Sequence, residues 1–292
     1  METLLQLVLA GLSLGSVYAL LLLGLLLIYR VSKAVNFSQG QVGMIAAFVA
    51  FWLYETVGLP EWVALLVGLS LAAGIAYLTE RLLIRPLQER PSVAGQDLVV
   101  TLAVLLLLTA LAETLLGTQS KTFLSLGNGT QFAVGTAVAN LNQLVVLAFV
   151  FIVLLGFAAF LRMRPGVAMI ASATNPQLAR MFAVNVNRVS AITWAVSGLT
   201  AGLAGIIIAS RLSVNPYYMT PFLISAFVAG IIGGFDRFVA PILVAFGLAM
   251  FQTWVIYIFG ASASTLSIFV LILLLLAVLP RRFLIEEKEA RA

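Results

Sequence analysis

Long apolar runs are the feature that most constrains this chain. They form blocks of about 16 to 26 residues, and a helix needs about 20 residues to cross the hydrocarbon core of a bilayer. The chain is 62% hydrophobic and only 9% charged, too little charge to cover the surface of a soluble domain of this length. Only helices and closed barrels satisfy every backbone polar group in lipid, and the runs lack the alternation of barrel strands. The sequence therefore predicts an all-α, polytopic integral membrane bundle.

We expect one transmembrane domain over residues 1–292, with about eight to ten membrane segments by the length of the apolar runs. The second and seventh segments are short for a full crossing, which is typical of broken or re-entrant helices. The nine expected segments are Leu4–Tyr29, Val42–Val57, Trp62–Thr79, Leu98–Gly117, Leu141–Leu161, Ala191–Ser210, Pro221–Gly234, Phe238–Phe259 and Ser264–Pro280.

The basic residues predict the orientation of the bundle. Cytoplasmic loops carry an excess of lysine and arginine, and the arginine-rich segments 81–90, 162–188 and 281–291 fall on one side if all nine helices cross. We therefore expect the N-terminus outside and the C-terminus in the cytoplasm, which leaves only Lys121 and Arg211 outside among sixteen basic residues. The net charge of +5 does not indicate nucleic-acid binding, because the basic residues stand singly or in small groups between apolar blocks.

The two halves of the chain resemble each other. Residues 36–50 align without a gap to residues 215–229, with six of fifteen positions identical, starting with Asn36 and Asn215. An odd number of helices separates the copies, so the two copies have opposite orientations in the membrane. Inverted repeats with matching helix breaks point to the central site of a transporter, and we expect repeat halves at about residues 4–117 and 191–280. Chance similarity between apolar helices is the alternative.

The polar breaks in these repeats are the candidate substrate path. Amide and hydroxyl groups at membrane depth are costly unless they line a wet cavity or meet protein partners. The alternative for the first break is a cytoplasmic loop that merely joins two helices. The residues expected on the path are Asn36, Ser38, Gln39, Gln41, Asn215, Tyr217 and Tyr218.

The segment 162–190 is the second candidate site. It carries four arginines and no acidic residue, and its Pro165-Gly166 pair predicts a break in the fifth helix. Asn175-Pro176 predicts an N-cap and the first residue of a short helix, on which Leu178 and Phe182 share an apolar face. An exposed amphipathic helix predicts a protein partner; the alternative is a helix resting on anionic lipid.

Several classes of function are disfavoured by absences. The chain has no cysteine and no histidine, which removes thiolate chemistry and the commonest metal ligand. None of its three lysines stands in a P-loop motif, and no paired carboxylates or nucleophile–base set is present. We therefore expect no enzymatic activity, no metal and no cofactor in this chain.

Particular motifs resemble the LivH-type permease subunits of branched-chain amino acid ABC importers. They include the opening Gly11-Leu-Ser-Leu-Gly-Ser-Val-Tyr-Ala-Leu20, Val35-Asn36-Phe37 with Gly40, the turn with Glu80-Arg81 and Arg85-Pro86-Leu87, and the glycine-rich run Ser197–Gly205. The resemblance extends over about residues 10–282. It implies that the segment 162–190 docks on an ATPase. The coupling residues carried over are Arg164, Gly166, Asn175, Pro176, Leu178, Ala179, Arg180 and Phe182.

The chain also departs from that family. The family usually has Asn-Phe-Ala-His-Gly-Glu where this chain has Asn36-Phe-Ser-Gln-Gly-Gln41, so a histidine and a carboxylate are replaced by amides. The glycine that normally ends the docking helix is Ala183 here. These departures leave the substrate open.

The resemblance implies a heteromeric importer in the bacterial inner membrane. Its other parts would be a second, LivM-like permease, two cytoplasmic ATP-binding subunits and an extracytoplasmic solute-binding protein, with membrane lipid around the permeases and no nucleic acid. The transported solutes would be branched-chain amino acids or related small amphipathic molecules. A secondary transporter or a channel for a small solute is the alternative, because inverted repeats with broken helices also occur there.

Overall fold

The computed structural model describes residues 2–89, 95–117, 119, 131–134, 137–260, 263 and 266–270. Its elements are α1 (Glu2–Ser32), α2 (Gln39–Glu55), α3 (Glu61–Leu78), the π-helical turn η1 (Thr79–Ile84), α4 (Arg85–Gln88), α5 (Gln96–Leu116), β1 (Gln131–Val134), β2 (Ala137–Asn140), α6 (Leu141–Phe160), α7 (Arg164–Thr174), α8 (Pro176–Met181), α9 (Val186–Ala209), α10 (Thr220–Gly233) and α11 (Val239–Phe259). The two strands form an antiparallel hairpin, and helices make up nearly all the rest of the described elements.

The predicted membrane bundle is confirmed. Five helices are long and apolar enough to cross a bilayer: α1, α3 with its continuation to Gln88, α5, α9 and α11. The bent pair α6–α7 makes a sixth if it counts as one span. The two helices expected to be short are short, with 17 residues in α2 and 14 in α10. Most of the expected ninth helix, Ser264–Pro280, lies outside the described residues.

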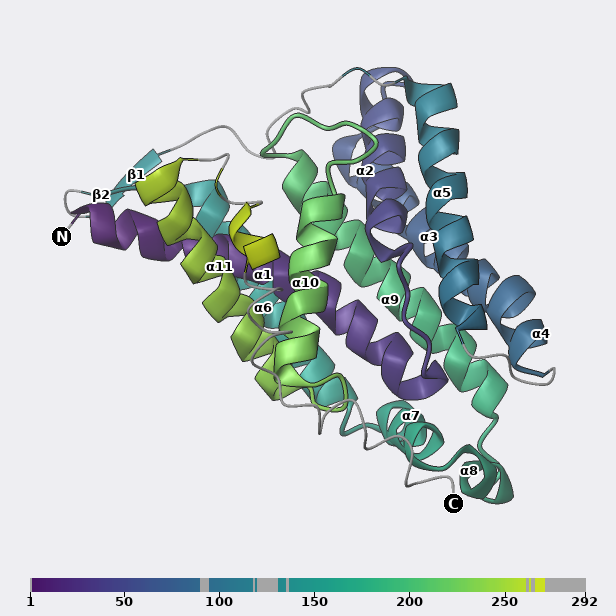
Figure 1. Cartoon of the computed structure of the whole chain (residues 1–292). Helices are drawn as coiled ribbons and strands as arrows, with labels where there is room; N and C mark the ends of the chain where they lie inside the picture. Colours follow the sequence, from purple (N-terminus) through teal and green to yellow (C-terminus); the bar gives the residue numbers. More distant parts are fainter. Residues whose placement is uncertain are drawn as a thin grey trace.

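Two helices form the centre of the bundle. The apolar window of α1 is 89% buried and that of α9 is 72% buried, against 28% or less for α3, α5 and α11. α1 packs against α11, α9 packs against α3, and α1 and α9 pack against each other. In Figure 1, α6 and α11 accompany α1, whereas α2, α3 and α5 stand together beyond α9.

Glycines permit the close approach of these helices. The Cβ of an alanine at Gly15 on α1 would lie 3.0 Å from the Cα of Phe246 on α11. A Cβ at Gly198 on α9 would collide with the carbonyl oxygen of Ala72 on α3. Small residues at three- and four-residue spacing are the usual contact of helices in lipid, so the glycine spacing in the sequence reports helix packing.

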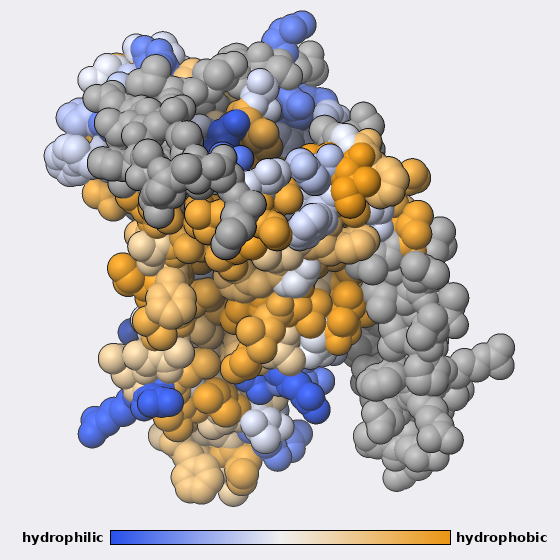
Figure 2. Space-filling view, turned by 90° about the vertical axis from the view of Figure 1, so that its left-hand side faces the viewer, coloured by the Kyte–Doolittle hydropathy of each residue, from blue (hydrophilic) through white to orange (hydrophobic). Residues whose placement is uncertain are grey.

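The surface carries the polarity of a membrane protein. Figure 2 shows an apolar belt around the middle of the described surface, with hydrophilic groups above and below it. The exposed large side chains of α3 and α5, such as Leu66, Leu106 and Leu107, are free to contact lipid or a partner helix in this single chain.

The break after α6 lies earlier than the sequence indicates. α6 and α7 meet at an angle of 73°, and α6 already ends at Phe160. Pro165 stands in the first turn of α7 instead of in the break, where its missing N–H costs nothing. A Cβ at Gly166 would meet the Cα of Leu161 at 2.5 Å, so this glycine permits the tight turn between the two helices.

Candidate substrate path and docking surface

The first polar break is a closed hydrogen-bonded turn in this structure. Asn36 Oδ1 accepts hydrogen bonds from the backbone N–H of Ser38 at 3.0 Å and from its hydroxyl at 2.7 Å. Asn36 Nδ2 donates to Gln39 Oε1 at 3.1 Å. All three residues are buried. The turn lets the chain reverse from the extended residues after α1 into α2 without leaving a buried polar group unpaired.

Gln39 and Gln41 tie the start of α2 to its neighbours. Gln39 Nε2 donates to the Ser197 carbonyl, and the Ser197 hydroxyl donates to Gln39 Oε1, both at 2.9 Å. Gln41 Nε2 donates to Thr109 Oγ1 at 3.2 Å, whereas Gln41 Oε1 is buried without a partner in the described part of the chain. Gln41 is thus the member of this group with an acceptor left over for water or a solute.

The second break repeats the turn of the first. Asn215 Oδ1 accepts from the backbone N–H of Tyr217 at 2.9 Å, just as Asn36 does from Ser38 in the aligned position. Tyr218 is buried and its hydroxyl donates to the Gly205 carbonyl at 2.9 Å. Tyr217 is exposed and its hydroxyl donates to Glu113 Oε1. The hydrogen bond and the charge of the Glu113 carboxylate raise the pKa of Tyr217.

The N-terminal ends of α2 and α10 meet. A Cβ at Gly40 would lie 3.3 Å from the Leu223 side chain and 3.4 Å from that of Met219. The rings of Phe37 and Phe227 stack with their centroids 4.8 Å apart. The two breaks are thus brought together through apolar contacts. Among the described hydrogen bonds, the polar side chains of each break pair within that break or with α5 and α9.

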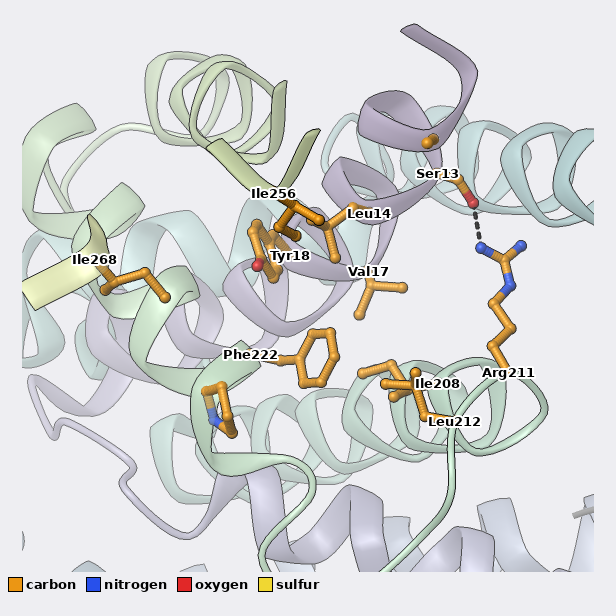
Figure 3. Close-up of a pocket in the computed structure, with 12 residues that line it drawn as sticks. Ser13, Leu14, Val17, Tyr18, Ile208, Arg211, Leu212, Phe222, Ile256 and Ile268 are labelled. Carbon is orange, nitrogen blue, oxygen red and sulfur yellow. Dashed lines mark hydrogen bonds between the residues drawn. The ribbon is translucent and has the colours of Figure 1, made fainter. Parts of the chain in front are cut away.

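A cavity of about 350 Å³ lies beside the second break. Figure 3 shows Leu14, Val17 and Tyr18 of α1 on one side of it, and Ile208 and Phe222 on the other. Arg211, just past the end of α9, reaches across its rim and donates to the Ser13 hydroxyl. At the floor, the Tyr18 hydroxyl donates to Gln252 of α11. No sequence motif marks this cavity, because its walls come from segments far apart in the chain.

The predicted docking segment folds into two short helices at one end of the bundle (Figure 1). Asn175 caps α8 as expected, accepting from the Leu178 N–H at 2.9 Å, and Pro176 stands in its first turn. The side chains of Met181 and Phe182 are 82% and 76% exposed. The structure also separates the eight expected coupling residues into two groups. Gly166 and Ala179 are buried, whereas Arg164, Asn175, Pro176, Leu178, Arg180 and Phe182 are exposed.

A bridge from η1 to the docking segment was not anticipated. The Arg85 guanidinium contacts both carboxylate oxygens of the buried Glu80, at 3.3 and 2.7 Å, and donates to the Asn187 carbonyl at 2.9 Å. Asn187 lies in the first turn of α9, just after α8. π-Helical turns often occur at functional sites. Glu80 and Arg85 are five residues apart, a spacing that a π-helical turn brings together, and this could have predicted the ion pair. It could not have predicted the hydrogen bond to the Asn187 carbonyl.

The fold defines a class: a multi-pass helical membrane protein with a bent pair of helices and no catalytic constellation among its described residues. The family comparison agrees with that class. The chain belongs to the family described as the permease component of the branched-chain amino acid transport system, whose model matches residues 7–279. Membership implies ATPase and solute-binding partners, and the chain itself is not an enzyme.

Curated relatives cover most of this chain. The high-affinity branched-chain amino acid transport system permease protein LivH of Escherichia coli K12 is 27% identical over 77% of each chain. The protein BraD of the same description from Pseudomonas aeruginosa is 26% identical over 94% of each chain. A probable LivH of Methanocaldococcus jannaschii is 27% identical over 86% of this chain and 81% of its own length.

Proposed function

We propose that this chain is half of the membrane path of an importer for branched-chain amino acids or related small amphipathic solutes. A second, LivM-like permease would complete the path, two cytoplasmic ATP-binding subunits would drive it, and an extracytoplasmic protein would deliver the solute. The curated relatives, which are described as branched-chain amino acid permeases, support this substrate class. The chain would lie in the bacterial inner membrane with its N-terminus outside and its C-terminus in the cytoplasm.

The exposed face of α8 is the observation that carries the ATPase-driven part of the proposal. Leu178, Met181 and Phe182 present a bare apolar surface at one end of the bundle, beside Arg180. The segment 162–190 has no acidic residue, so it complements an acidic, apolar-lined groove on a partner. Contiguous exposed apolar groups rimmed by charge are typical of protein interfaces. This segment is therefore our candidate for the ATPase contact, with Gly166 and Ala179 shaping it from beneath.

The two breaks are our candidate for the substrate path. The shared turn at Asn36 and Asn215, and the reciprocal packing of α1 with α11 and of α9 with α3, support two inverted halves at about residues 4–117 and 191–280. The polar side chains would line the path once the ends of α2 and α10 move apart. The free acceptor of Gln41 supports this role. The path residues remain Asn36, Ser38, Gln39, Gln41, Asn215, Tyr217 and Tyr218.

The test is uptake by proteoliposomes that contain the assembled permeases and ATPases. We expect leucine uptake to need both ATP and the binding protein. Phe182→Glu should reduce uptake and ATPase co-purification at least tenfold, as expected when a buried interface aromatic is replaced by a charge (about 2 kcal/mol or more). Phe182→Leu, which keeps an apolar side chain, is the matched control and should retain most of both.

Uptake that continues without ATP but stops when the ion gradient is dissipated would contradict the proposal and favour a secondary transporter. Full ATPase co-purification with Phe182→Glu would remove the docking role from α8 and leave the transport function standing.

A further inference from the structure

The cavity between α1, α9, α10 and α11 combines apolar walls with a cation. Leu14, Val17, Ile208 and Phe222 supply apolar surface, and Arg211 is the one charged side chain among the described residues that line it. Of its hydroxyl groups, that of Tyr18 already donates to Gln252. An apolar pocket of a few hundred Å³ with a few placed polar groups is the usual form of a small-molecule site.

Arg211 has unused binding capacity. Its described partner is the neutral hydroxyl of Ser13, although a guanidinium offers five N–H donors. The ion pairs within the described residues are Lys33–Asp236 and Arg85–Glu80, and neither involves Arg211. Desolvation lowers the pKa of Arg211, although the residue as a whole is exposed. A desolvated guanidinium favours a carboxylate, to which it donates two parallel hydrogen bonds.

The equivalent place at the other end of the α1–α9 pair is closed. The register that aligns Asn36 with Asn215 also aligns Ser32, at the end of α1, with Arg211. Ser32 is fully engaged: its hydroxyl lies 3.2 Å from that of Ser190 and accepts from Trp194 Nε1 at 3.0 Å. Trp194 is 0% exposed, so side chains fill the space there. Among the described residues, buried and hydrogen-bonded side chains occupy that end of the pair, in contrast to the open cavity at Arg211.

We propose that this cavity is a carboxylate site for an aliphatic amino acid that enters the path from outside. The carboxylate would pair with Arg211 and the aliphatic side chain would lie against Val17 and Phe222. No acidic residue is described on the lining, so the ammonium group stays toward the open mouth. Pro221 and Phe222 of α10 line the cavity, and the next residue, Leu223, contacts Gly40 at the first break. Adjacent residues at the start of α10 thus face the cavity and the first break.

This inference rests on the proposed function for its direction and its ligand class, but its test does not need transport. The chain has no cysteine, so Leu212→Cys introduces a single thiol in this chain on the cavity lining, where Leu212 is 48% exposed. In the assembled complex in lipid nanodiscs, the rate of maleimide labelling is measured with leucine, with 4-methylpentanoate (which lacks the amine) and with leucinol (which lacks the carboxylate). A cysteine-free copy of this chain in the same complex gives the background.

We expect leucine and 4-methylpentanoate to slow the labelling and leucinol to leave it unchanged. Arg211→Gln should raise the half-protecting concentration about tenfold, the equivalent of about 1.4 kcal/mol. Arg211→Lys, which keeps the charge without the planar fork, should raise it less. Val57→Cys, in the turn after α2 and 50% exposed but not on the cavity lining, is the matched control and should label at one rate throughout.

Equal protection by leucinol, or protection that survives Arg211→Gln, would overturn the carboxylate site. Labelling that is slow in nanodiscs, fast in detergent and indifferent to all three probes would assign the cavity to a lipid chain instead and also overturn it. If Arg211→Gln does not assemble with the ATPases, Arg211→Lys and the three probes still decide. Protection of the thiol by leucine without ATP-driven uptake would contradict only the proposed function. ATP-driven uptake without protection would contradict only this site.

Discussion

Single residues decide how the short segments of this protein end. Ala183 has φ +60, in the left-handed region. It follows α8 in a closing turn in which Ala183 N–H donates to the Arg180 carbonyl and Val184 N–H to the Ala179 carbonyl, both at 3.1 Å. Glycine is the usual residue at this position. The alanine is therefore a strained residue beside the proposed docking face.

We predict that Ala183→Gly stabilises the end of α8 by about 0.5–1 kcal/mol, because relief of the left-handed strain exceeds the extra entropy of glycine in the unfolded chain. Hydrogen exchange of the amides of Ala183 and Val184 should become slower, with uptake retained. Ala171→Gly, an exposed position inside α7, is the opposite control and should destabilise that helix by about 1 kcal/mol. Faster exchange of the amides at positions 183 and 184 in Ala183→Gly than in the parent protein would contradict the strain argument.

At the scale of elements, the long helices were predictable and their connections were not. Apolar runs located α3, α6 and α11 to within a residue or so, because burial in lipid depends on composition. α9 begins at Val186 instead of Ala191, since Asn185 caps it by accepting from the Arg188 N–H at 3.0 Å. α7 was missed, because no run of eighteen apolar residues marks an eleven-residue amphipathic helix.

In the candidate sites, too, local features could be predicted from the sequence and tertiary contacts could not. The break at Asn36 was predicted from the sequence, but its hydrogen-bonded turn was not, although an Asn side chain can bond its own backbone two residues on. The partner of Gln39, Ser197, was not, and neither was the link from Arg85 to Asn187, because tertiary packing brings these residues together. Sequence patterns thus identified polar groups that the structure buries at the helix breaks, but only the structure shows which of them are hydrogen-bonded.

The bridge through Arg85 gives a prediction about coupling between elements. Arg85→Gln would leave the buried Glu80 carboxylate uncompensated and free the first turn of α9. In a double-mutant cycle with Glu80→Gln, we expect a coupling free energy on the order of 1–3 kcal/mol in unfolding. If the bridge also positions the docking segment, Arg85→Lys should raise the ATP hydrolysed per leucine imported while the complex stays assembled. Additive effects of the two glutamine variants would show that the ion pair carries no coupling.

At the scale of the whole molecule, the arrangement of exposed and buried groups predicts which side of the membrane each surface meets. The predicted docking helices lie at one end of the bundle (Figure 1), and Tyr217 belongs to the loop that joins α9 to α10. α9 runs from the docking segment to this loop. A helix of 24 residues is about 36 Å long at 1.5 Å per residue, enough to span the hydrocarbon core. We therefore predict that the two surfaces face opposite sides of the membrane.

Three single cysteines in this cysteine-free chain test the proposed orientation and the central break together. With a membrane-impermeant thiol reagent on intact cells, Tyr217→Cys should label from outside, because Tyr217 is 56% exposed. Met181→Cys should label only once the reagent reaches the cytoplasm, and the assembled ATPase should slow it. Ser38 is 1% exposed, so the thiol of Ser38→Cys should resist the reagent from both sides until ATP turnover separates α2 from α10.

Labelling of Met181→Cys from outside would reverse the proposed orientation. Full labelling of Ser38→Cys from the cytoplasm in every transport state would make the break an ordinary loop and remove it from the path.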